Sequence, residues 1–179
     1  MPDPSVVPQS YRVEDFLSAE NLDLADATVT EIFQMMFGFE IGPKVDAVAT
    51  PPAPPVDERT AIVGFSGSMR GSCQIRMTTP AAQSIASAML GGVPIEDGDD
   101  SIDDALGELC NMLAGSWKSG IPALSSDCSL SPPTVISGQN YKVHVSKPSV
   151  KLSRIYQFDT HLLHLALYRE DIEPGWQPL

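Results

Sequence analysis

Two similar successions of helical and strand-like patterns follow one another along the chain. Apolar residues recur with helical spacing at 27–38, 81–90 and 101–118. Segments that alternate, or that are rich in β-branched and apolar residues, lie at 44–50, 59–67, 70–78, 128–136, 141–145, 150–158 and 161–168. The segment 128–136 is interrupted by Pro132-Pro133, and Gly67-Ser68-Met69 is a plausible hairpin turn. The order is therefore helix and strands, a short apolar helix, then helix and strands again.

Two of the helical segments are related in sequence. Segment 27–38 reads ATVTEIFQMMFG and segment 104–115 reads DALGELCNMLAG. Without gaps, Glu31 falls on Glu108 and Gln34 on Asn111, and both segments end in glycine, a helix C-terminal signal. This duplication predicts an α/β (α+β) domain with a pseudo-twofold repeat of helix plus three strands. We expect a broad, mainly antiparallel sheet with long helices packed on one side.

The proline-rich stretches indicate how the chain is divided. Residues 1–13 contain three prolines and little that could pack, so we expect a disordered tail there. The stretch 51–55 predicts a loop between strands, because too little chain precedes it to form a domain. We expect a single domain over 14–170 and a C-terminal tail over 171–179.

The predicted helix 101–118 carries one polar stripe. At about 100° per residue its members fall on one face, namely Asp104, Glu108, Asn111, Gly115 and Lys118. The opposite face is apolar and includes Leu106, Leu109, Cys110, Leu113 and Trp117, which we expect to bury against the sheet. Ser101, followed by Asp104, is a fair N-cap pattern for this helix.

The stripe can be an ordinary solvent face or a site. Asn111 favours a site, because asparagine costs a few tenths of a kcal/mol inside a helix relative to Lys, Glu or Gln. Gly115, one turn further on, leaves room for another backbone to approach. A carboxylate can hold a partner's cation, and a carboxamide one turn away can orient a water molecule. An acyl phosphate is already activated, so orienting that water supplies much of the acceleration that its hydrolysis needs.

Composition and charge narrow the range of possible binding partners. The formal net charge of −12 disfavours nucleic acid and anionic membranes. The acidity is partly local, in the segment Glu96-Asp97-Gly98-Asp99-Asp100, here called the acidic loop, and then in Asp103-Asp104. We interpret it as a solvated approach to the helix at 101, or as a surface that steers a partner with a basic rim.

The chain also lacks the usual sequence signals for a membrane span, for secretion and for metal binding. No run reaches the roughly 18 apolar residues that span a bilayer, and the N-terminus has no signal-peptide core, so we expect a cytoplasmic protein. The three cysteines, at 73, 110 and 128, have no metal-ligand spacing and are expected to be buried thiols. His161 and His164 would point to opposite faces of a strand, so we expect no metal site.

At the polar stripe the sequence resembles the CheC, CheX and FliY phosphatases of bacterial chemotaxis. Their motif is Asp or Ser, three residues, Glu, two residues, Asn, and about twenty-two residues to a Pro. Here the motif corresponds to Asp104, Glu108, Asn111 and, one residue short of the usual spacing, Pro133. The tail Asn-Met-Leu-Ala-Gly and the later Pro-Pro-Thr-Val-Ile-Ser-Gly are similar as well. The resemblance covers about residues 15–170.

The resemblance implies roles for these residues. Glu108 would bind the active-site lysine of a phosphorylated CheY-type response regulator, and Asn111 would orient the attacking water. Mg²⁺ would belong to the regulator, so the chain would bring no cofactor of its own. The corresponding Glu31 and Gln34 of the first half would form a degenerate site, since Gln is longer by one methylene. With one working site the chain would be similar to CheX, and this resemblance implies a homodimer.

Two other functions remain open from the sequence. The first is a noncatalytic adaptor of the same fold, which would bind response regulators or flagellar and signalling proteins without hydrolysis. The second is a small-molecule sensor, which would need a deep apolar pocket beneath the helix 101–118.

Overall fold

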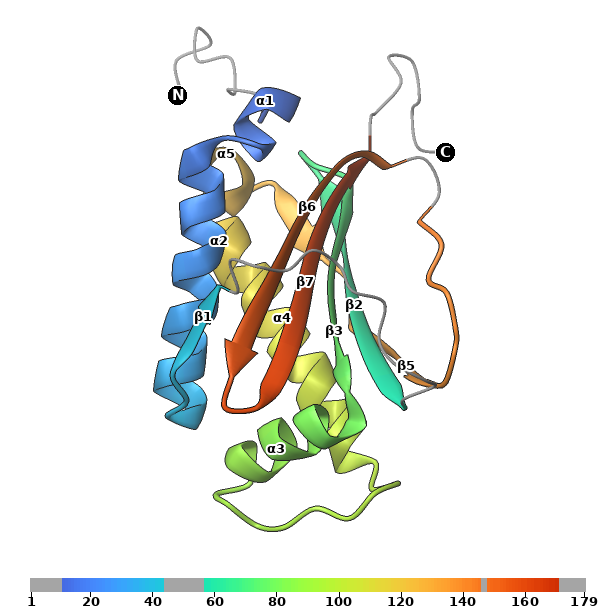
Figure 1. Ribbon diagram of the computed structural model, residues 1–179. Coiled ribbons are helices and arrows are strands. Elements are labelled where there is room, and N and C mark those ends of the chain that lie inside the picture. Colours follow the sequence, from blue (N-terminus) through green and yellow to red (C-terminus); the bar gives the residue numbers. More distant parts are fainter. Residues whose placement is uncertain (1–10, 44–56, 146–147, 171–179) are drawn as a thin grey trace, which may run out of the picture.

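The computed structural model describes residues 11–43, 57–145 and 148–170 (Figure 1). The expected strand at 44–50, the proline-rich loop 51–55, the C-terminal tail 171–179 and residues 1–10 lie outside these ranges. Residues 11–13, which we expect in the N-terminal tail, belong to the folded chain. Tyr11 packs edge-on against Phe16, with ring centroids 6.3 Å apart. Helix α1 (Val13–Phe16) begins immediately afterwards.

The centre of the molecule is one seven-stranded sheet in which every described pairing is antiparallel. Its strands are β1 (Ile41–Pro43), β2 (Glu58–Gly67), β3 (Gly71–Thr78), β4 (Cys128–Leu130), β5 (Thr134–Gly138), β6 (Pro148–Phe158) and β7 (His161–Glu170). Their order is β1-β6-β7-β3-β2-β4, with β5 also paired to β2. The expected mainly antiparallel sheet is confirmed.

The two halves of the chain exchange strands across this sheet. Each half contributes one long hairpin, β2–β3 or β6–β7, and the two hairpins meet where β3 pairs with β7. The short strand β1 of the first half lies beside β6, whereas β4 and β5 of the second half lie beside β2. The arrangement follows the duplication seen in the sequence.

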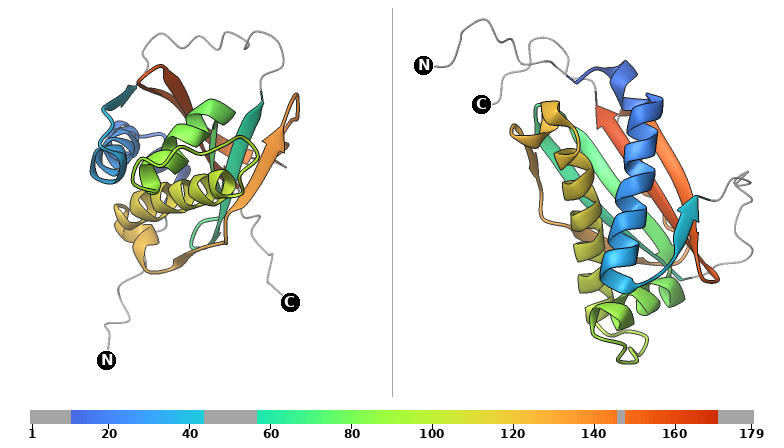
Figure 2. Two further views of the ribbon diagram at one scale, coloured as in Figure 1. Left: turned by 90° about the horizontal axis from the view of Figure 1, so that it is seen from below. Right: turned by 90° about the vertical axis from the view of Figure 1, so that its left-hand side faces the viewer.

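Two long helices cover one face of the sheet. The long helices are α2 (Ala19–Ile32), which the π-helix η1 (Phe33–Phe37) continues, and α4 (Ser101–Ser119). The shorter helices are α3 (Thr79–Met89) and α5 (Pro122–Ser125). Figure 2 shows α2 and α4 side by side across that face, with α3 at one end. None of the helices in the described ranges is both long enough and apolar enough to cross a bilayer.

The core fills the layer between these helices and the sheet. The expected apolar face of α4 is buried there: Leu106, Leu109 and Cys110 are 0% exposed, and Trp117 is 2% exposed. Burying a side chain of this size stabilises the fold by about 1.5–3 kcal/mol. On β3 the alternation places Cys73, Ile75 and Met77 in the same layer. The buried apolar residues of α4 therefore fix the rotation of this helix about its own axis.

A buried polar network joins the end of α4 to the N-terminal helices. The Trp117 indole N–H donates to Asn21 Oδ1 (2.9 Å), and Asn21 Nδ2 donates to the Phe16 carbonyl (2.7 Å). The rings of Phe16 and Trp117 meet edge to face, 5.9 Å apart. The network satisfies the indole and amide groups that burial would otherwise leave unpaired.

Two local predictions are wrong. Residues 141–145 are not a strand; instead Tyr141 reaches back so that its hydroxyl lies 2.7 Å from Thr60 Oγ1. Ser101 is the first residue of α4 and does not act as its cap. The expected helix 101–118 is confirmed, because α4 runs from Ser101 to Ser119 and passes through Gly115. Gly38 does end η1, with a left-handed φ of 68°.

Candidate functional site

The polar stripe of α4 lies on the surface, as the sequence predicts. Asp104 and Glu108 are exposed, and Asn111 and Gly115 are partly exposed. Among the described residues, the side chains of Glu108 and Asn111 form no hydrogen bond or ion pair. Lys118, the last member of the stripe, is engaged differently: its ammonium donates to the Ser125 carbonyl of α5 (2.9 Å). Glu108 and Asn111 are therefore accessible on a helix whose other face is packed.

The N-terminus of α4 is capped from the acidic loop. Asp99 Oδ1 accepts a hydrogen bond from the Ser101 amide (2.8 Å), and these contacts lower the pKa of the Asp99 carboxyl. Asp103 and Asp104 lie in the first turn, where carboxylates interact favourably with the helix dipole. The acidic residues before the stripe thus stabilise the end of the helix that presents Glu108.

One flank of the stripe contacts the segment between β4 and β5. A Cβ built on Gly107 would lie 3.3 Å from Pro133 Cγ and 3.6 Å from Val135 Cγ2. Pro133, the last motif residue, therefore packs directly on the helix beside Glu108. Gly107 does not belong to the polar stripe or to the motif, so neither pattern singles it out. A glycine in a helix interior costs about 1 kcal/mol relative to alanine, and that cost is the signal that could have found it.

Beneath the stripe, α4 is held by buried contacts. Cys110 Sγ donates to the carbonyls of Ala61 (3.5 Å) and Cys73 (3.6 Å). The neighbouring Cys110 thiol and burial raise the pKa of Cys73, which keeps that thiol protonated. All three cysteines are buried and free, as expected. They pack the core and supply no nucleophile to the site.

The corresponding stripe of the first half differs in backbone geometry. Glu31 and Gln34 are both exposed, as on α4, but Gln34 lies within the π-helix η1. A π-helix has a wider turn than an α-helix, so the direction of Gln34 relative to Glu31 changes. Met35 beside it is 75% exposed. The two halves share residue types and differ in how the backbone presents them.

Other candidate sites receive little support. His161 and His164 lie on β7, and the described residues contain no cluster of His, Cys, Asp and Glu suited to a metal ion. Beneath α4 a cavity lined by Thr28 and by apolar residues that include Val29, Leu113 and Leu165 holds only about 10 Å³. That is room for about one water molecule. The packed interface counts against a small-molecule sensor.

The site therefore consists of a carboxylate and a carboxamide on successive turns of a rigid helix. Side chains three residues apart on a helix are neighbours, so both groups can engage one partner at once. An amide has both a donor and an acceptor and can hold a water in a defined orientation. Neither group requires a shifted pKa or a metal ligand for this chemistry.

Comparisons with known proteins agree with the fold. A family model described as "Chemotaxis phosphatase CheX" matches residues 59–154, which include the whole stripe and Pro133. The chain is 30% identical over 105 residues to the "CheY-P phosphatase CheX" of Thermotoga maritima, covering 56% of this chain and 68% of that protein.

Solved structures show the same architecture. The chemotaxis protein CheX from Desulfovibrio desulfuricans has a TM-score of 0.69 and 24% identity, covering 84% of this chain and 99% of that one. CheX from Borrelia burgdorferi, solved as a complex with CheY, BeF₃ and Mg²⁺, has a TM-score of 0.62 and 20% identity. That match covers 84% of this chain and 96% of that chain.

Proposed function

Since this chain belongs to the CheX family of chemotaxis phosphatases, we propose that it hydrolyses the aspartyl phosphate of a CheY-type response regulator. The observation that carries the proposal is the accessible pair Glu108 and Asn111 on the packed helix α4. The family likeness supports the same activity, since the Thermotoga maritima relative is a CheY-P phosphatase and the Borrelia burgdorferi CheX binds CheY.

In the proposed reaction the regulator supplies the phosphoaspartate, the magnesium ion and a lysine. The Glu108 carboxylate pairs with that lysine and orients the two proteins. The Asn111 amide enters the regulator's site and holds one water in line with the phosphorus–oxygen bond that breaks. Positioning accounts for the acceleration, because the acyl phosphate needs no covalent activation by this chain.

The deciding experiment compares Asn111→Ala with the wild-type protein. The phosphorylated regulator is mixed with each protein and its decay is followed. The wild-type protein should accelerate the decay, and Asn111→Ala should lower that acceleration by at least about tenfold, because the water is no longer oriented. Binding of the regulator should largely survive.

Gln34→Ala is the matched control, because it removes an exposed amide at the corresponding place in the first half. It should leave the rate unchanged. If the wild-type protein binds the regulator and leaves its decay unchanged, the chain is a noncatalytic adaptor. Equal rates for wild type and Asn111→Ala would refute the role of the amide.

The same likeness leads us to propose two further properties. The protein acts as a homodimer, and it works in the cytoplasm beside its regulator. The dimer is tested by the mass of the particle in solution.

A further inference from the structure

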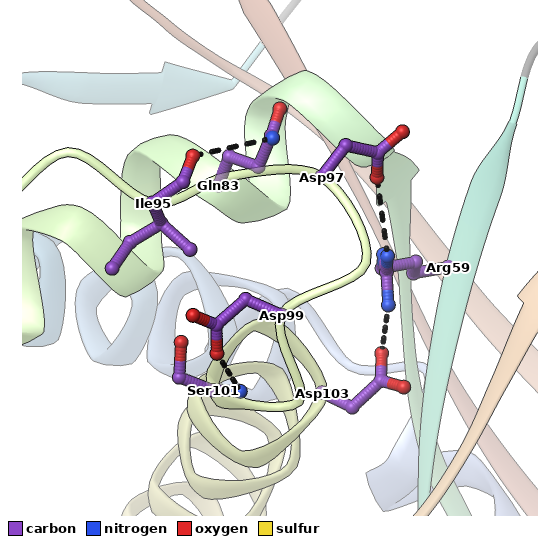
Figure 3. A network of polar contacts seen from close by, with 7 residues as sticks. All are labelled: Arg59, Gln83, Ile95, Asp97, Asp99, Ser101 and Asp103. Carbon is purple, nitrogen blue, oxygen red and sulfur yellow. Dashed lines mark hydrogen bonds and ion pairs between the residues drawn. The ribbon is translucent and has the colours of Figure 1, made fainter.

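A buried arginine lies behind the N-terminal end of the site. Arg59, at the start of β2, points into the layer between the sheet and the helices and is 8% exposed. One of its terminal nitrogens donates to Asp103 in the first turn of α4, and the other lies 3.7 Å from Asp97 Oδ1 in the acidic loop. Figure 3 shows the guanidinium between these two carboxylates. Arg59 thus connects the sheet to two consecutive segments of the chain, the acidic loop and the first turn of α4.

The loop has further tethers on both sides of this contact. Gln83 of α3 donates to the Ile95 carbonyl (3.5 Å), and Asp99 caps the Ser101 amide. Between residues 96 and 104 the chain carries six acidic side chains, which repel one another. Arg59 places a positive charge against two of them, and so offsets a repulsion that would otherwise open the loop and the first turn.

Arg59 is not explained by stability alone. The side chains of its partners Asp103 and Asp97 are 39% and 71% exposed, and ion pairs with exposed acids contribute little stability, so the fold does not need this arginine merely for its stability. The two terminal nitrogens of a guanidinium can contact two acids in a fixed geometry, whereas an ammonium is a single point charge. The arrangement therefore favours a role in holding Asp97 and Asp103 at a set separation.

The other half of the molecule has a comparable anchor without the loop contact. Extending the ungapped alignment by one residue places Asp26 of α2 on Asp103. Asp26 Oδ1 lies 3.3 Å from Arg154 Nε of β6 and accepts from the Tyr156 hydroxyl (2.7 Å). Both long helices are thus tied to a strand arginine through the same position. On α4 the arginine also reaches the acidic loop.

We propose that Arg59 is a positioning residue for regulator docking, an inference that rests on the proposed function. Its contacts with Asp103 and Asp97 hold the first turn of α4 and the acidic loop in one arrangement. That arrangement fixes the direction in which Glu108, little more than one turn further along α4, meets the regulator's lysine. Asn111 lies another turn away, so Arg59 governs docking and not the orientation of the water.

The test separates kcat from KM for dephosphorylation of the regulator. Arg59→Met should raise KM about tenfold and change kcat by less than about twofold, because docking weakens while the Asn111 step is retained. Arg59→Lys should recover part of the loss, since an ammonium can hold one acid but not both. Asp97→Asn removes only the loop contact and should raise KM about twofold with no change in melting temperature.

The matched control is Arg154→Met, which breaks the equivalent anchor on α2. It should lower the melting temperature and leave KM unchanged. The inference is overturned if folded Arg59→Met keeps the wild-type KM, or if its kcat falls at constant KM. Should Arg59→Met fail to fold, unchanged KM values in both Arg59→Lys and Asp97→Asn overturn it.

Failure of the proposed function is recognised separately. If the wild-type protein does not hydrolyse the phosphoaspartate, docking is measured as the Kd for the regulator activated by beryllofluoride and Mg²⁺. A Kd raised by Arg59→Met and unaffected by Arg154→Met then supports the role of Arg59 without the reaction. An unchanged Kd, or the absence of wild-type binding, overturns it.

Discussion

At the scale of single residues, the site depends on two side chains that the fold does not use. Glu108 and Asn111 are accessible, and neither has a polar partner among the described residues. Their neighbours on α4 are buried, which holds the helix in one rotation. Asn111 costs helix propensity and gains no polar contact within the described chain, which favours a site over an ordinary solvent face.

The first prediction concerns Glu108. Glu108→Ala should raise KM for the regulator at least about fivefold, because a charge pair across the interface is lost. The kcat should fall less than in Asn111→Ala. Steady-state kinetics with a phosphorylated regulator measure both quantities.

Glu31→Ala is the matched control for this prediction, since Glu31 is the equivalent exposed carboxylate of the first half. Its KM should equal that of the wild-type protein. Equal effects of the two substitutions would show a general effect of negative charge and contradict a specific role for Glu108.

At the scale of elements, the two long helices differ in their regularity. Helix α4 is α-helical from Ser101 to Ser119, whereas α2 ends at Ile32 and continues as the π-helix η1. The position equivalent to Asn111 falls within that π-helix. The first half therefore differs from α4 in its backbone as well as in the length of Gln34.

This difference predicts that the first half cannot be repaired by one substitution. In an Asn111→Ala background, Gln34→Asn should restore no phosphatase activity, because η1 directs residue 34 differently relative to Glu31. The decay of the phosphorylated regulator measures the outcome. Recovery of activity would mean that side-chain length alone separates the two halves.

The N-terminal cap of α4 predicts that the stability of the first turn of this helix depends on pH. Hydrogen bonds from Ser101 lower the pKa of Asp99 in the folded protein. The unfolded value is about 3.9, so the cap stabilises the helix above about pH 4 and is lost as the pH falls through the lower folded value. Amide hydrogen exchange of the first turn of α4 should therefore accelerate below pH 4, relative to that of α3.

Asp99→Ala is the direct comparison for the cap. Its first turn should exchange faster than in the wild-type protein at neutral pH, and the difference should shrink in acid, where the wild-type cap is also lost. A constant difference across the pH range would contradict a cap that depends on the charge of Asp99.

At the scale of the whole molecule, the two halves form one unit because they exchange strands. Strand β1 of the first half completes the side of β6, and β4 and β5 of the second half complete the side of β2. Neither half has its full sheet alone, so we do not expect either to fold separately. The stripe of α4 lies on the surface of this joint structure, where a partner protein can reach it.

The oligomeric state is a prediction at the same scale. Light scattering should give a particle of twice the 19.2 kDa of one chain. The mass should be independent of concentration over the micromolar range. A particle with the mass of one chain would contradict the homodimer, and it would leave the proposed reaction, which needs one α4, unaffected.

The parts of the fold that sequence reasoning missed depend on contacts between distant segments. The alternation at 141–145 is typical of a strand, but Tyr141 instead places its hydroxyl against Thr60 of β2. Gly107 and Pro133 are far apart in sequence, and only the packing of β5 beside α4 brings them together. The pairing of Arg59 with Asp103 likewise spans 44 residues, and neither the strand pattern around Arg59 nor the helix pattern around Asp103 indicates it.

Local patterns in the amino-acid sequence are sufficient to predict the helices, most strands, the duplication and the stripe from Asp104 to Asn111. These features follow from periods of a few residues, which local geometry sets. Long-range packing sets the strand exchange, the π-helix that contains Gln34 and the contacts of α4 with Arg59 and Pro133. Such features depend on which distant surfaces pack together, and a local pattern of polar and apolar positions does not specify its partner.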